Sequence, residues 1–178
     1  MHMVTLGLVA AGVAVCDSEI LCRFPENECT CELCVDACNT SPCWGTPQEM
    51  DALIRAGYGK KLMVYVLPED EFDDRPAGIF MDRVWVVSPA YKTFKSRTSA
   101  RAMSVSAGHP GVLYKCVFLK RGGLCELHDP GLKPIEGRIE HHEISGAEAI
   151  AIRREIFKLW NTPYGTEVAH RWYDEYHL

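Results

Sequence analysis

Long hydrophobic runs and internal repeats are missing from this chain of 178 residues. The apolar N-terminal stretch, residues 3–16, is shorter than the roughly 20 residues that a membrane-spanning helix needs. It also lacks a preceding lysine or arginine, and Val15 stands where a small residue normally precedes a signal cleavage or lipidation site at Cys16. We therefore expect a buried strand here rather than an export signal, and a cytoplasmic protein without membrane contact.

An excess of positive charge is missing too, because the formal net charge is −5. Such a chain has no general attraction for nucleic acids or anionic membranes, so an anionic partner would need a local basic patch. The segment 91–101 is the candidate for binding a protein or another anionic partner, although a solvated loop explains it as well. The basic residues of this segment are Lys92, Lys95, Arg97 and Arg101. Arg138, outside the segment, is a further candidate for anion binding.

Nucleophile triads and glycine-rich phosphate loops are not recognisable in this sequence. Cysteine, in contrast, is abundant: there are nine, an odd number, and five of them lie within residues 29–43. The hydrophobic content of 47% is enough for a core without disulfide bonds. In a reducing compartment, clustered cysteines are more often metal ligands than disulfides. A disulfide-bearing exported protein remains the weaker alternative.

The first group of cysteines has the spacing of a metal site. Cys31-x2-Cys34-x3-Cys38 is preceded by Cys29 and followed by Cys43. A gap of two residues lets two thiolates turn toward one ion, as in zinc ribbons and iron–sulfur loops. Disulfides between residues so close in sequence would be strained and would restrict the unfolded chain only slightly.

A second group of donors lies far downstream, in Cys116-x8-Cys125-x2-His128. Each of these residues alone could be a buried core residue, but together with the first group they supply enough donors for one four-coordinate site, or for two. Zinc is the expected metal, with iron or an iron–sulfur cluster as the alternative, because the spacing is not that of bacterial ferredoxins. Four thiolates around a divalent ion leave about two negative charges, which Lys115 or Lys133 could offset.

The remaining sequence predicts one α+β domain with an N-terminal cysteine loop over 29–46. Thr46-Pro47-Gln48-Glu49 is a capping box that opens a helix ending near Gly57 or Gly59. Residues 61–67 and 83–87 have the β-branched and aromatic composition of strands. A hairpin is predicted over 112–128, around Gly122-Gly123. C-terminal helices are predicted over 145–177. The first begins at a capping box at Ser145 and runs to about Trp160, and the second begins at Thr162-Pro163.

With these motifs the chain resembles the YkgJ-like cysteine-cluster family, which is described as zinc- or iron-chelating. The resemblance covers about residues 29–60 and 112–138. It rests on "CELCVDAC" followed by "SPCWGTPQE", and on "CVFLKRGGLCELHDPGLKPIEGR". It implies a metal-binding domain and specifies no activity.

One position departs from the family pattern. A further cysteine commonly precedes the arginine after the Lys-Pro turn in that family, whereas this chain has Gly137 before Arg138. Either Cys43 or Cys29 replaces that donor, or the site keeps an open position, which is typical of catalytic zinc.

Two functions are therefore predicted. The first is a zinc- or iron-binding protein with a structural or adaptor role, in which the metal fixes the cysteine loop to the hairpin. The alternative is a metal-dependent enzyme that modifies a protein or nucleic-acid group at an open metal position, with His109, Glu126 or Glu136 moving protons.

Overall fold

The computed structural model describes a central part of the chain and most of its C-terminal half. The described residues are Glu32, Val35, Cys38, 43–68, 83–90, 116–139 and 144–177. The predictions for the apolar run 3–16 and for the basic segment 91–101 lie outside these residues.

Helix α3, Pro47–Leu53, begins at the capping box that the sequence predicts. The Thr46 side chain accepts a hydrogen bond from the Glu49 N–H at 3.2 Å, and the Glu49 carboxylate accepts one from the Thr46 N–H at 2.9 Å. The regular helix ends before the predicted glycines, because the chain continues as a π-helical turn, η1, Ile54–Tyr58. Gly57 interrupts the helical conformation inside this segment with a φ of 85°, which glycine adopts without strain.

Both predicted strands are confirmed, and they form a two-stranded antiparallel sheet. A single 3-10 turn, η2, Gly59–Lys61, leads into β1, Leu62–Pro68, which pairs with β2, Arg83–Pro89. Val64 lies opposite Val87, and both side chains are fully buried. The fold is therefore α+β, as expected.

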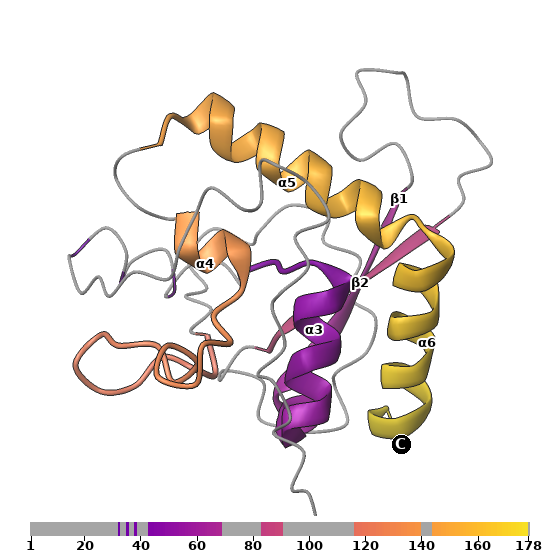
Figure 1. Cartoon of the computed structure of the whole chain (residues 1–178), viewed down its shortest axis with the longest axis horizontal. Coiled ribbons are helices and arrows are strands. Elements are labelled where there is room, and N and C mark those ends of the chain that lie inside the picture. The colour runs from indigo at the N-terminus through magenta and orange to yellow at the C-terminus, as the bar shows by residue number, and fades with distance from the viewer. Residues whose placement is uncertain are drawn as a thin grey trace, which may run out of the picture.

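The two C-terminal helices are also confirmed. Helix α5, Gly146–Trp160, is capped by the Ser145 side chain, and α6, Pro163–Tyr176, is capped by the side chain of Thr162. Helices α3, α5 and α6 all pack on β2, so the sheet is covered by helices from both ends of the described chain (Figure 1).

Two buried tryptophans fix these helices to the segments that flank α3. Trp160 Nε1 donates to the Gly45 carbonyl at 2.8 Å, and Trp172 Nε1 donates to the Gly59 carbonyl at 2.9 Å. Glycine is required at position 59, since a Cβ there would lie 2.2 Å from the ring of Tyr176. The indole hydrogen bonds satisfy polar groups that would be costly to bury alone.

The predicted hairpin is described from Cys116 onward. It forms a tight loop with one antiparallel bridge, Leu119 to Cys125, and no strand is assigned within 116–139. Gly122 and Gly123, at φ of 99° and 89°, make the turn. The chain then forms a short helix that the sequence did not predict, α4, Ile135–Ile139, which packs on α5 (Figure 1).

Within the described ranges, no helix is both long enough and apolar enough to cross a bilayer.

Candidate metal centre

Four of the predicted ligands line one small cavity. Its volume is about 10 Å³, roughly the space that one water-sized sphere occupies. The sulfur-bearing residues in its wall are Cys38, Cys43, Cys116 and Cys125. The rest of the wall is Pro89, Phe118, Leu119, Leu127, Lys133 and Pro134. Residues from both cysteine groups therefore meet at one place in the fold.

Backbone hydrogen bonds bring the two cysteine groups together. The Cys116 N–H donates to the Cys38 carbonyl at 2.8 Å, which ties the loop to the N-terminal helical residues. The Val117 N–H donates to the Ala90 carbonyl at 2.9 Å, which ties the same loop to the end of β2. The positions of these cysteines thus depend on main-chain contacts as well as on their own side chains.

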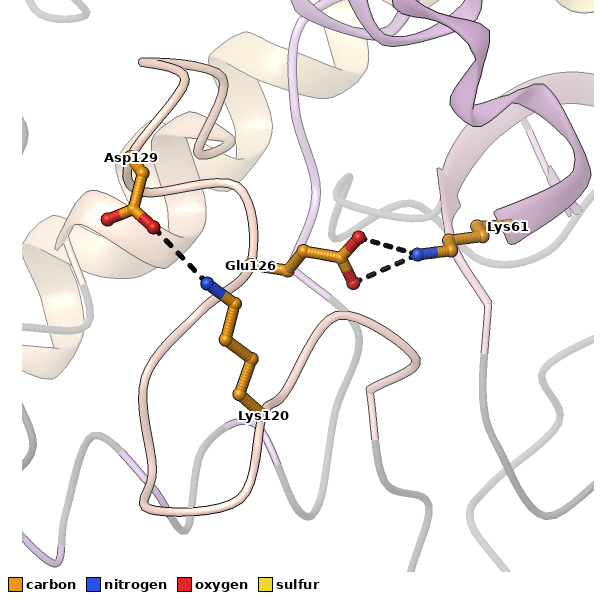
Figure 2. A network of polar contacts seen from close by, with 4 residues as sticks. All are labelled: Lys61, Lys120, Glu126 and Asp129. Atoms are coloured by element: carbon orange, nitrogen blue, oxygen red, sulfur yellow. Dashed lines mark hydrogen bonds and ion pairs between the residues drawn. The ribbon is translucent and has the colours of Figure 1, made fainter.

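Ion pairs anchor the loop that carries Cys116 and Cys125 (Figure 2). Lys61 Nζ lies 2.7 and 2.9 Å from the two carboxylate oxygens of Glu126, which follows Cys125 in the chain. The same ammonium group lies 5.3 Å from the centre of the Phe118 ring. A second pair, Lys120 to Asp129 at 3.2 Å, joins two exposed parts of the loop. The first pair connects the loop to the start of β1, whereas the second is internal to the loop.

A buried carboxylate anchors the segment that carries Cys43. Glu136 in α4 is 3% exposed, and its carboxylate accepts hydrogen bonds from the Trp44 backbone N–H and from the Arg153 guanidinium. The Glu136 N–H in turn donates to the Trp44 carbonyl at 3.1 Å. Arg153 also lies over the Trp44 ring, 5.6 Å from its centre. Trp44, the residue after Cys43, is therefore held to Glu136 in α4 through both its N–H and its C=O.

Arg138, a predicted anion-binding residue, is engaged in a similar contact. Its Nη2 lies 2.7 Å from Glu49 Oε1, and its side chain is 20% exposed. The other oxygen of Glu49 accepts from the Ile135 N–H at 3.2 Å as well as from the capped Thr46. The Glu49 carboxylate thus accepts hydrogen bonds at the starts of both α3 and α4, and it also pairs with Arg138.

The electrostatic surroundings favour protonated thiols at two of the cysteines. The pKa of Cys43 is raised well above its ordinary value, first by a hydrogen bond to Cys38, then by burial and by the charges of Cys38, Cys116 and Glu136. Burial raises the pKa of Cys125, against the opposing effects of a hydrogen bond from the Leu127 backbone and the charge of Lys133. Binding a cation would reverse this preference, since a metal stabilises thiolates.

Gly137, the position that departs from the family pattern, lies directly beside this cavity. A Cβ built on Gly137 would lie 3.1 Å from Cys43 Sγ and 3.4 Å from Lys133 Cε. Glycine therefore leaves space for the Cys43 sulfur against α4. A cysteine side chain at this position would begin beside the Cys43 sulfur.

The other predicted site residues that the structure describes are not in this cavity wall. His128 is half-buried at the end of the loop and does not line the cavity. Glu126 and Glu136, considered as proton carriers, are both held in ion pairs. The predicted residues outside the described ranges are Cys29, Cys31, Cys34, Lys92, Lys95, Arg97, Arg101, His109 and Lys115.

In the described part of the chain, no group of three or more His, Cys, Asp or Glu side chains is arranged to hold a metal ion. The four cysteines share a cavity, but their sulfurs do not stand as a finished coordination shell. The chemistry of the donors fits a thiophilic ion, whereas their present side-chain arrangement does not yet fit one.

Sequence reasoning did not identify the residues that hold the site together. Lys61 follows a glycine turn and looks like an ordinary surface lysine, so no local signal marks it as the partner of Glu126. Arg153 lies on α5 at a position that helical periodicity leaves half-exposed. Lys133 is the exception, because its proximity in the sequence to the second group of donors predicted a cation near the cysteines.

Comparison with known proteins adds no relative, because no family model, curated protein or solved structure matches the chain. The resemblance to the YkgJ-like family therefore stays a prediction based on the cysteine motifs.

Proposed function

We propose that this protein binds a metal ion, most suitably zinc, through Cys38, Cys43, Cys116 and Cys125, and that the metal has a structural or adaptor role. The observation that carries the proposal is the single small cavity that these four cysteines line. They come from two segments that are far apart in the chain, 38–43 and 116–125, and the fold brings both segments to this cavity.

The donor set favours zinc over other metals. Zinc in structural sites is four-coordinate and is commonly held by four cysteines, which fill every position around it. A cavity of about 10 Å³ suits one ion better than a cluster of several iron and sulfide atoms. Iron remains the alternative, because thiolates also hold single iron ions.

The surroundings supply part of the charge that four thiolates require. A zinc ion with four thiolates has a net charge of about −2, which second-shell donors and cations usually offset. The Leu127 backbone donates to Cys125, and Lys133 stands in the cavity wall. We infer that loading the site redirects the cysteine side chains by rotation about their Cα–Cβ bonds, while the backbone contacts remain.

A second candidate function rests on Gly137. Because Gly137 supplies no sulfur where a cysteine side chain could begin, this candidate is a metal-dependent enzyme that keeps an open metal position and acts on a protein or nucleic-acid group. Four cysteines already line the cavity and would complete a tetrahedral shell without position 137. We therefore place the structural role first.

Elemental analysis of full-length protein, purified reduced and without a metal-affinity tag, tests the proposal. We expect about one equivalent of zinc, and a loss of zinc and of thermal stability together in Cys125→Ser. Ligand linkage gives about 2.7 kcal/mol at a free zinc concentration of 100 times Kd. For a chain of this size that corresponds to about 5 to 11 °C in Tm.

Cys22→Ser is the matched control, because it removes a cysteine from outside the predicted ligand set. It should keep both zinc and Tm. Unchanged stability after zinc removal from the wild type would contradict the structural role. Cobalt-substituted protein whose visible spectrum shifts on adding an external thiol would instead favour the open position of the second candidate.

A further inference from the structure

Two of the four cysteines are in direct contact with each other. Cys38 and Cys43 both lie in the wall of the same cavity of about 10 Å³, and a hydrogen bond joins their side chains. No disulfide joins any two of Cys38, Cys43, Cys116 and Cys125. The two sulfurs are therefore neighbours in the thiol form.

The two thiols differ in their access to solvent. Cys43 is 8% exposed, whereas Cys38 is half-buried. In dithiol pairs that undergo oxidation, the accessible sulfur attacks the oxidant first. The buried neighbour then attacks the oxidised sulfur and displaces the group attached to it, which forms the disulfide. Cys38 and Cys43 have this division, because Cys38 is the more accessible thiol and Cys43 is its buried neighbour.

The short separation of the pair in sequence also matters. A disulfide between residues five positions apart restrains little unfolded-chain entropy, so it makes a poor structural bond. Strained or accessible disulfides have higher reduction potentials and are the labile, regulatory ones. A bond between these two cysteines would therefore be readily reduced again, as a reversible switch requires.

We propose that Cys38 and Cys43 are a redox-active dithiol that a peroxide converts to a disulfide, and that this oxidation empties the metal site. The first half stands on the contact between the two thiols, and the second half rests on the proposed zinc site. Oxidation would remove two of the four sulfur donors and leave Cys116 and Cys125, which cannot fill a four-coordinate shell alone.

The reaction balances with one peroxide as oxidant. Cys38 Sγ attacks one peroxide oxygen, so an S–O bond forms, the O–O bond breaks, and the departing oxygen takes the thiol proton and leaves as water. Cys43 Sγ then attacks the Cys38 sulfur, so the S–S bond forms and the S–O bond breaks. The hydroxyl leaves as a second water with the Cys43 proton. Two thiols lose two electrons, and one hydrogen peroxide becomes two waters.

The chain allows a direct test, because cleavage before aspartate releases residues 36–50. This peptide, between Asp36 and Asp51, contains Cys38 and Cys43 and no other cysteine. Full-length reduced protein, freed of metal with a chelator, is treated with hydrogen peroxide, alkylated and digested. We expect most of the peptide to resist alkylation and to be two hydrogens lighter, and dithiothreitol to restore both alkylation sites.

Cys43→Ser supplies the control for the order of attack. Without the buried thiol, the oxidised Cys38 should persist as a sulfenic acid that dimedone labels within the same peptide. Cross-linking of peptide 36–50 to another cysteine peptide, or full alkylation at both positions after peroxide, would overturn the proposal.

Zinc-loaded protein separates this proposal from the proposed function. Release of zinc in step with formation of the 38–43 disulfide supports both. A 38–43 disulfide in protein that never binds zinc supports the dithiol and refutes the metal site as well as its emptying. Zinc that stays bound while the peptide remains fully alkylated supports the metal site and refutes the dithiol.

Discussion

Replacing Glu136 with glutamine should destabilise the protein more than any other single change at the site that preserves side-chain shape. The Glu136 side chain is 4% exposed, and one of its oxygens lies 2.6 Å from Arg153 Nε while the other accepts from the Trp44 N–H. A glutamine keeps one acceptor oxygen but turns an NH2 group toward a second donor. One hydrogen bond to a charged group is therefore lost, and the NH2 group of the glutamine faces another donor, either the Trp44 N–H or the Arg153 guanidinium.

The size of the effect follows from these contacts. Hydrogen bonds to charged groups contribute about 1.5 to 3 kcal/mol, and breaking a fully buried ion pair costs about 3 to 5 kcal/mol. The Arg153 side chain is 38% exposed and can regain water contacts, which places the expected loss at the lower end. We expect Glu136→Gln to lower the free energy of unfolding by about 2 to 3 kcal/mol and Tm by about 4 to 12 °C.

Urea unfolding of reduced, metal-free protein, followed by tryptophan fluorescence, measures this loss. Glu155→Gln is the control, because Glu155 lies on the same helix as Arg153 and pairs with the exposed Lys158 at 2.7 Å. That change should cost less than about 0.5 kcal/mol. A loss below about 1 kcal/mol in Glu136→Gln would refute the view that the buried carboxylate fixes the Cys43 segment to α4.

Two further predictions concern the loop and the thiols. Lys61→Met removes the contact of the ammonium group with both carboxylate oxygens of Glu126 and should lower the free energy of unfolding, measured in urea, by about 1 kcal/mol. The control Lys120→Met loses only the exposed pair with Asp129 and should lower it by less than about 0.5 kcal/mol. Equal losses would contradict the role of Lys61 as the anchor of the loop. The folded-state pKa values of Cys43 and Cys125 are both raised above their ordinary value of 9.0, so the folded protein keeps protons that the unfolded chain releases. The contribution of these two thiols to the stability of the reduced, metal-free protein should therefore be fully present below about pH 9 and decrease as the pH rises further. A urea midpoint at about pH 10 that equals or exceeds the midpoint at about pH 8 would contradict this.

Local signals predicted the parts of the fold that depend on neighbouring residues. A cap involves residues three apart, so Thr46 with Glu49, Ser145 and Thr162 could be recognised as the starts of helices from the sequence. β-branched runs likewise predicted β1 and β2. The end of α3 was less predictable, because nothing local required the change to a π-helical turn at Ile54.

Long-range contacts decided what the sequence could not show. Glu49 was predicted as a capping residue, but its contacts with Ile135 and Arg138 bridge 86 and 89 positions in the chain. The cysteine spacing likewise predicted a site, whereas only the fold shows Cys38 and Cys43 beside Cys116 and Cys125. His128, which fitted the spacing equally well, does not line the same cavity.

The contacts around the cavity bear on how a metal would act here. Cys116 belongs to the same hydrophobic core as Leu127 and Ile135, and the Cys43 segment is held by Glu136 and Trp44. These contacts do not need a metal, so the cysteines are neighbours before any ion binds. Zinc would then add stability to a fold that already exists, in contrast to zinc fingers, which unfold without it. For that reason we expect a shift in Tm on metal loss rather than global unfolding, and a thiol pair that stays close enough to oxidise.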